Sequence, residues 1–245
     1  MRSIRQARSA NLLAQLQTLF MQHDLASSIR TQPGHHLGWA ATVATRHAQA
    51  VVAEVAHILK ALSGGPVILL KGAAYTMAAL PHAAGRVYSD VDILVPREAI
   101  EEVESQLMIR GWLATHYYSY DQRYYRQWMH EIPPLQHIRR RSVIDVHHAI
   151  LPLTMRVHPD SDKLREAAVQ LPERPDVMVL APVDMLLHSA AHLFYEGELV
   201  HGLRDLLDLD ALLRHFSGHP DFWPRLVERA GELELTRCLF YALRY

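Results

Sequence analysis

The stretch Val87-Tyr88-Ser89-Asp90-Val91-Asp92-Ile93-Leu94-Val95 places two carboxylates in an otherwise apolar run. Its Val and Ile content predicts a buried β-strand that stops at Pro96. Side chains alternate faces along a strand, so Asp90 and Asp92 are expected to point the same way. An Asp-x-Asp pair is most often a solvated turn, but these flanks are not turn-like. Because two adjacent like charges resist burial, the stretch predicts a bound divalent cation.

Composition narrows the class of protein and the kind of partner. The 245 residues are 49% hydrophobic and 21% charged, with a formal net charge of −1. This balance gives no support for a long nucleic acid or a membrane surface as partner. The single cysteine, Cys238, excludes an internal disulfide and fits a reducing compartment. No apolar run reaches the length of a membrane span, so we expect a cytoplasmic protein.

A second motif lies upstream of the two aspartates. The short apolar run 66–70 predicts a strand, and Lys71-Gly72 connects it to a predicted helix over 73–80. Backbone N–H groups at the start of a helix have no partner within the helix and can bind phosphate. Lys71 would add a positive charge beside them.

A third carboxylate lies in another predicted strand, 143–147. Asp145 and His147 share one face of this strand, and Ile144 and Val146 share the other. A carboxylate in the middle of an apolar strand is hard to explain by packing alone.

The remaining pattern is mainly helical. Further helices are predicted over 9–30, 37–62, 97–110, 182–197, 199–216 and 220–245, with a loop at 31–34 and short strands at 135–139 and 177–180. We divide the chain into an N-terminal helical segment (1–62), a core with a small mixed β-sheet (63–150) and a mainly helical region (151–245). The fold class is α/β (α+β), with helices from both ends packed on the core. The apolar C-terminal end is either packed within the fold or part of an interface, so the sequence is also compatible with a homo-oligomer.

The order of these motifs resembles the polymerase-beta-like nucleotidyltransferase superfamily. Within it, the chain is similar to the uncharacterised bacterial nucleotidyltransferase family 5 group over roughly residues 65–150. The resemblance is carried by Leu70-Lys71-Gly72, by 86–95 and by Ile144-Asp145-Val146-His147. It implies that Asp90 and Asp92 hold two Mg²⁺ ions and that Asp145 completes one of the sites. Mn²⁺ is expected to substitute for Mg²⁺.

The same resemblance implies an activity. A nucleoside monophosphate would move from a nucleoside triphosphate such as ATP to the hydroxyl of an unknown small-molecule or protein acceptor, with release of pyrophosphate. Two metal ions would clamp the attacking and leaving oxygens, and Asp145 could accept the proton of the hydroxyl. The residues expected to bind the nucleotide phosphates are Lys71, Gly72, Arg86 and Ser89. His147 and His192 are expected to contact the metal ligands without binding the metal themselves.

One departure from the superfamily pattern leaves alternatives open. Gly72-Ala73 replaces the usual Gly-Ser or Gly-Gly, which removes one phosphate contact. A non-catalytic binding or regulatory protein, of antitoxin or assembly-factor type, is therefore an alternative, although the three intact aspartates argue against it. A phosphohydrolase that binds metal through His188, His192 and Asp205 is a second alternative.

Two further groups of residues are candidates for the edge of the site. His130-Glu131 follows a predicted loop or short helix and could reach the cleft. The aromatic residues of 117–128 favour a packed surface flap over an acceptor pocket. They are Tyr117, Tyr118, Tyr120, Tyr124, Tyr125 and Trp128.

Overall fold

A mixed β-sheet forms the centre of the computed structural model, which describes residues 2–25, 27, 29, 31–62, 65–116, 118–195 and 202–245. Seven strands of the described residues form it, in the order β3-β4-β5-β2-β1-β7-β6. The strands are β1 (Val67–Leu69), β2 (Val91–Leu94), β3 (Trp112–Ala114), β4 (Leu135–His137), β5 (Val143–His147), β6 (Val169–Leu171) and β7 (Arg174–Val179). The predicted α/β class with a mixed sheet is confirmed.

Helices cover both sides of this sheet. They are α1 (Arg2–Ser9), α2 (Leu13–Gln22), α3 (Thr31–Ala61), α4 (Lys71–Met77), α5 (Ile100–Ile109), α6 (Ser119–Trp128), α7 (Ser161–Glu166), α8 (Pro182–Tyr195), α9 (Gly202–Phe216), α10 (Phe222–Glu232) and α11 (Thr236–Arg244). Short 3₁₀ turns occupy Pro81–Ala83 and Arg97–Ala99. No described helix is both long enough and apolar enough to cross a bilayer.

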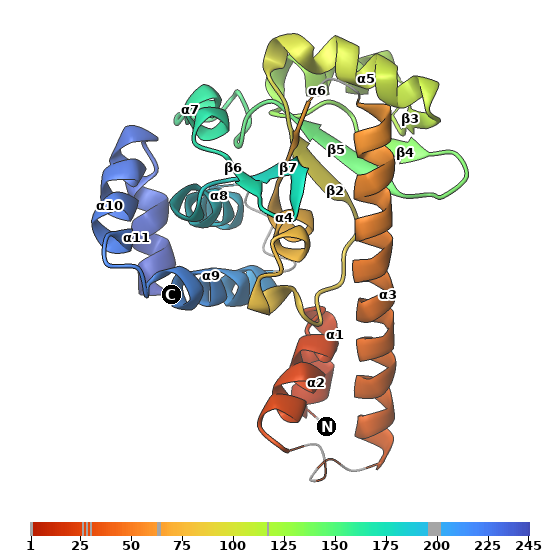
Figure 1. Cartoon of the computed structure of the whole chain (residues 1–245), viewed down its shortest axis with the longest axis vertical. Coiled ribbons are helices and arrows are strands. Elements are labelled where there is room, and N and C mark those ends of the chain that lie inside the picture. The colour runs from red at the N-terminus through yellow and green to blue at the C-terminus, as the bar shows by residue number, and fades with distance from the viewer. Residues whose placement is uncertain are drawn as a thin grey trace.

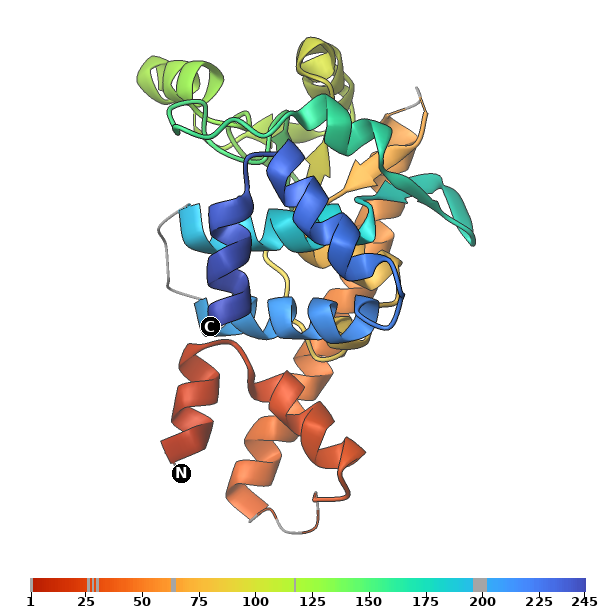
Figure 2. The ribbon, with the colours of Figure 1, turned by 90° about the vertical axis from the view of Figure 1, so that its left-hand side faces the viewer.

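The helices fall into groups on opposite sides of the sheet. The long helix α3 passes along one side, and helices α8 to α11 gather on the other (Figure 1). Helices α1 and α2 pack beside the first half of α3, away from the sheet (Figure 2). Buried apolar residues of the sheet, α3, α4 and α8 form one continuous core. The N-terminal helices therefore extend from the molecule, whereas the C-terminal helices complete its core.

The register of the central strands brings three parts of the chain together. Strand β2 is antiparallel to β1 and parallel to β5, and Asp92 is paired with Asp145 across the β2–β5 ladder. The backbone N–H of Leu70 donates to the carbonyl of Asp92 at 3.0 Å. The end of β1, the start of β2 and the middle of β5 are consequently neighbours.

Strand β2 is shorter than the predicted strand over 87–95. It covers Val91–Leu94 only, and each of its four residues is buried. Asp90 precedes the strand, so its predicted position in the middle of a strand is wrong. The strand is short because residues on the Asp90 side face a cavity and not a neighbouring strand.

Two predictions for the N-terminal segment are also wrong. The helix over 9–30 is in fact two helices, and Asn11 between them has a φ of 57°, which ends a right-handed helix. The loop at 31–34 is the first turn of α3. Pro33 fits there because the first N–H groups of a helix have no partner within it.

The C-terminal region contributes to the sheet as well as to the helices. The candidate strand at 177–180 is part of β7, which begins at Arg174 and runs parallel to β1. Strand β7 also pairs with β6, which sequence reasoning missed. The division at residue 150 stays a prediction. The helix over 220–245 is wrong as one element, because Glu234, with a φ of 58°, separates α10 from α11. Parts of the predicted segments, residues 1, 26, 28, 30, 63–64, 117 and 196–201, lie outside the described residues.

An ion pair connects α8 to α10. Arg229 donates to both carboxylate oxygens of Asp184, from Nε at 2.7 Å and from Nη2 at 3.0 Å. The Asp184 side chain is completely buried, and that of Arg229 is 16% exposed. Loss of one partner would leave the other charge buried without compensation.

We expect Arg229→Met to lower the free energy of unfolding by about 3–5 kcal/mol, because it leaves the buried Asp184 carboxylate unpaired. Urea unfolding followed by circular dichroism measures this loss. Arg214→Met is the matched control, since Arg214 pairs with Asp210 on the surface of α9 and its removal should cause no measurable change. Equal stability of both variants would show that the α8–α10 ion pair does not stabilise the fold.

Candidate functional site

A cavity of about 630 Å³ opens beside the central strands. The start of β2, helix α4 and strand β5 contribute to one wall, and α8 and α9 form another. Asp90, Asp92 and Asp145 all line it. The three aspartates therefore face one space, although Asp90 and Asp92 come from the start of β2 and the residue before it, and Asp145 comes from β5, far away in the sequence.

Burial and mutual repulsion set the charge of two of these carboxyl groups. Burial, and then the charges of Asp92, Glu131 and Asp90, raise the pKa of Asp145 to about 8. Burial and the charge of Asp92 also raise the pKa of Asp90. The Oδ1 atom of Asp145 is buried and makes no hydrogen bond. This oxygen-rich, under-compensated set fits a hard divalent cation.

Asp92 differs from the other two because it has close partners. It is 4% exposed, with Nζ of Lys71 at 3.4 Å and Nε2 of His147 at 2.9 Å, both from the same oxygen, Oδ1. Burial alone would raise the pKa of Asp92, but the Lys71 charge and the His147 hydrogen bond hold it below its usual range. Burial lowers the pKa of His147, but the hydrogen bond to Asp92 together with the charges of Asp92 and Glu131 raises it above its ordinary value.

Lys71, whose side chain pairs with Asp92, has a strained backbone conformation. Its φ is 45°, in the left-handed region that non-glycine residues rarely adopt. The strain lies at the point where β1 passes into α4, directly beside the cavity. Strained backbone of this kind occurs often at functional sites.

A second group of potential ligands lies next to the aspartates. The donor atoms of His130, Glu131 and His147 all lie within 4.8 Å of one another, and among the described residues no other His, Cys, Asp or Glu trio does so. His130 and Glu131 line the cavity, as suggested for this dipeptide. The backbone of Glu131 forms an isolated antiparallel β-bridge with His147, the last residue of β5. The set considered for a phosphohydrolase, His188, His192 and Asp205, is not gathered in this way, and neither are the three aspartates.

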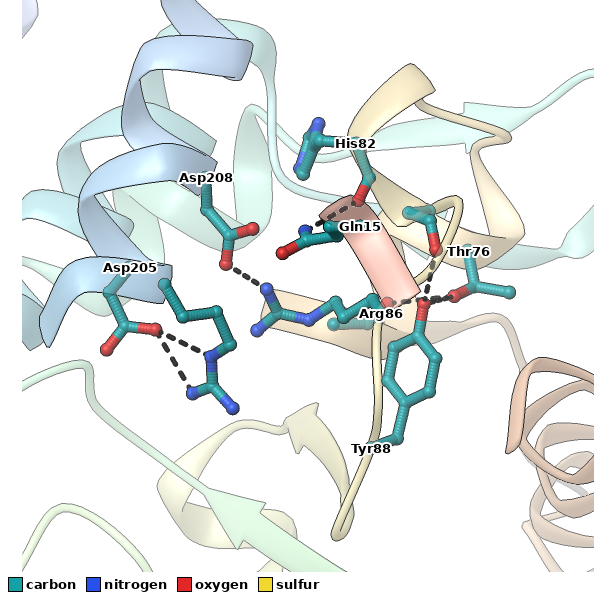
Figure 3. A network of polar contacts seen from close by, with 10 residues as sticks. Gln15, Thr76, His82, Arg86, Tyr88, Asp205 and Asp208 are labelled. Carbon is teal, nitrogen blue, oxygen red and sulfur yellow. Dashed lines mark hydrogen bonds and ion pairs between the residues drawn. The ribbon is translucent and has the colours of Figure 1, made fainter. Parts of the chain in front are cut away.

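The opposite wall is fixed by a buried polar network (Figure 3). Arg86 is 7% exposed and donates to the carboxylate of Asp208 on α9. Its guanidinium also lies 5.4 Å from the centroid of the Tyr75 ring and 6.0 Å from that of Tyr88. Arg86 thus joins the segment before β2 to the C-terminal helices.

Gly72 makes room for this network. A Cβ at this position would lie 2.9 Å from Nε of Arg86 and 2.9 Å from the Tyr88 ring. The Tyr88 hydroxyl in turn lies 2.5 Å from Oγ1 of Thr76 (Figure 3). The observed reason for a glycine here is close packing, and its predicted contact with phosphate stays a prediction.

The other predicted residues take different places. Ser89 is exposed and donates to Asp90 at 2.8 Å. His192 of α8 lines the cavity, where burial and the Lys71 charge lower its pKa to about 4. The aromatic helix α6 has no buried residue, and Tyr124 of that helix reaches the cavity.

Sequence reasoning missed Asp208 as a wall residue. Its signal was an acidic pair, Asp205 and Asp208, three residues apart on the otherwise apolar inner face of α9. Arg204 pairs with Asp205 at 3.1 Å, and both residues line the cavity.

The chain is similar to a solved structure and matches one protein family. The solution structure of the antibiotic-resistance factor ANT(2″)-Ia is similar at 13% sequence identity and a TM-score of 0.45, and the match covers 81% of this chain and 94% of that chain. No curated protein sequence matches significantly. A family model described as an uncharacterised nucleotidyltransferase matches residues 2–245, which is nearly the whole chain. The chain therefore belongs to this family and is a nucleotidyltransferase.

Proposed function

We propose that the protein transfers a nucleoside monophosphate from a magnesium-bound nucleoside triphosphate, such as ATP, to an acceptor hydroxyl, with release of pyrophosphate. The observation that carries this proposal is the β2–β5 register, which pairs Asp92 with Asp145 beside a cavity that Asp90 also lines. A cavity of about 630 Å³ suits a nucleotide and a small molecule or a single protein side chain. The near-neutral charge does not favour a long nucleic acid. The cysteine content favours a cytoplasmic setting.

The three aspartates are the residues that would hold the metal ions. Bound magnesium, which manganese could replace, supplies neutralisation of phosphate charge and makes the acceptor hydroxyl more acidic. Asp145 Oδ1, which makes no hydrogen bond, is the carboxylate oxygen available to accept the proton of that hydroxyl. His147 holds Asp92 in position through its 2.9 Å hydrogen bond.

Two cationic residues of the cavity have different proposed roles. Lys71 carries its charge on a four-carbon stem with several rotatable bonds and is 21% exposed, so its ammonium can turn from Asp92 toward a phosphate. Arg86 is almost completely buried and is bonded to Asp208. We assign phosphate binding mainly to Lys71, and assign to Arg86 the positioning of the α9 wall.

The direct test is calorimetric titration of a nucleotide panel in the presence of Mg²⁺. We expect the parent protein to bind at least one nucleoside triphosphate, and we expect Asp90→Asn/Asp92→Asn to lose this metal-dependent binding, because two anionic ligands become neutral. Thermal unfolding of the double variant controls for loss of the fold.

Absence of nucleotide binding to the parent, in both Mg²⁺ and Mn²⁺, would favour the non-catalytic alternative. If binding is observed, nucleotide labelled at the α-phosphorus can then be used to screen acceptors. Label that stays with the acceptor identifies nucleotidyl transfer, whereas label released only as free nucleotide would count against it.

A separate variant tests the proposed role of Lys71. We expect Lys71→Met to weaken nucleoside triphosphate binding by about tenfold, which corresponds to about 1.4 kcal/mol for one lost charged contact. Lys60→Met, in the last turn of α3, is the matched control and should bind like the parent. Unchanged affinity in the Lys71 variant would exclude this residue from phosphate binding.

A further inference from the structure

The backbone that carries His130 and Glu131 is paired with the end of β5. The N–H of Ile132 donates to the carbonyl oxygen of Val146 at 3.1 Å, and the N–H of His148 donates to the carbonyl oxygen of His130 at 2.8 Å. This pairing brings Glu131 opposite His147 and fixes the main chain of the three-residue group. The group is therefore built on ordered backbone next to a strand, which is a suitable support for ligands.

The distance between two of its donor atoms matches shared coordination. Oε2 of Glu131 lies 3.4 Å from Nδ1 of His147. Two ligands of one tetrahedral ion, each at about 2.0–2.1 Å from it, lie about 3.4 Å apart. Nδ1 of His147 is buried and makes no hydrogen bond, and the residue is 1% exposed.

The other ring nitrogen explains why a cation fits between these atoms. When Nε2 of a neutral His147 donates to Asp92, Nδ1 carries a lone pair that faces the Glu131 carboxylate. A lone pair and an anion repel each other at this distance unless a proton or a metal ion lies between them. Histidine ligands of metals commonly donate their second nitrogen to a carboxylate in this way.

The types of ligand distinguish this group from the aspartates. Two imidazoles and one carboxylate suit Zn²⁺ and related transition metals, whereas Mg²⁺ prefers oxygen ligands. His130 and Glu131 line the cavity, so an ion held here would border the space proposed for the nucleotide. It would also be connected to Asp92 through the ring of His147.

We propose that His130, Glu131 and His147 form a binding site for a zinc-class divalent cation, separate from the magnesium aspartates. The three side chains leave a fourth coordination position for water or a substrate oxygen. A cation at this site fixes the ring of His147, which in turn holds the Asp92 carboxylate. This site does not depend on nucleotide binding, so it can be tested independently of the proposed function.

The test uses the full-length protein after removal of metal, titrated with Co²⁺ in excess Mg²⁺. Co²⁺ is a spectroscopic substitute for Zn²⁺, and its visible absorption reports tetrahedral coordination. We expect the parent to bind one Co²⁺ that Mg²⁺ does not displace. His130→Ala and the isosteric Glu131→Gln should each weaken binding by at least about 100-fold, since loss of a direct ligand should cost no less than loss of an outer partner.

Two control comparisons separate this site from its surroundings. His148→Ala removes a buried neighbouring histidine that is not part of the group and should leave Co²⁺ affinity unchanged. Asp92→Asn should weaken binding by about 10–100-fold through His147, whereas Asp90→Asn should not. Thermal unfolding of each metal-free variant confirms that the fold is retained.

Three outcomes would overturn the proposal. One is absence of Co²⁺ binding to the folded parent, which would indicate that a proton lies between His147 and Glu131. Another is displacement of Co²⁺ by Mg²⁺ together with loss of binding in Asp90→Asn, which would place the ion at the aspartates. The third is unchanged affinity in both His130→Ala and Glu131→Gln.

Discussion

The burial of the Asp92 carboxylate is the constraint on which the rest of the site depends. A charged group that is 4% exposed is costly unless it is paired and hydrogen-bonded. Its two partners come from different elements: Lys71 from the start of α4 and His147 from the end of β5. The β1–β2 and β2–β5 registers are what bring these elements within reach. A shift of β2 by one residue along its neighbours would turn the Asp92 side chain toward the other face of the sheet. Its contacts with Lys71 and His147 would then be lost.

The C-terminal helices depend on the same region through a second buried charge. Arg86 follows Gly85, in the segment that leads into β2, and its bond to Asp208 attaches that segment to α9. Gly72 contributes by leaving space for the Arg86 and Tyr88 side chains. The C-terminal helices α8 and α9 thus form one wall of the cavity. The catalytic aspartates we propose and the helical region therefore act as one structural unit.

Sequence reasoning predicted the parts of this protein that follow from local pattern. The strand with Asp145 has the predicted bounds, and the apolar run before Lys71 is β1, because alternating or continuous apolar residues specify strands directly. The placement of β7 beside β1 could not be predicted, because pairing between distant strands depends on tertiary packing. The helix boundaries near Asn11 and Glu234 were missed because either residue also fits a continuous helix in sequence. The Arg86–Asp208 pair joins residues 122 positions apart, and no local signal connects them.

The charges of the cavity suggest how a nucleotide would be accepted. Each of three cationic side chains that line it is already close to an aspartate: Lys71 to Asp92, Arg86 to Asp208 and Arg204 to Asp205. Two further carboxyl groups, Asp90 and Asp145, have raised pKa values because they are buried and face other negative charges. Such a cavity repels a triphosphate that arrives alone. Under the proposed function, a triphosphate that arrives with divalent cations would reverse this balance, since the cations would satisfy the aspartates and leave the Lys71 ammonium available to phosphate. The same repulsion that makes the buried aspartates unfavourable for folding would then make nucleotide binding conditional on metal.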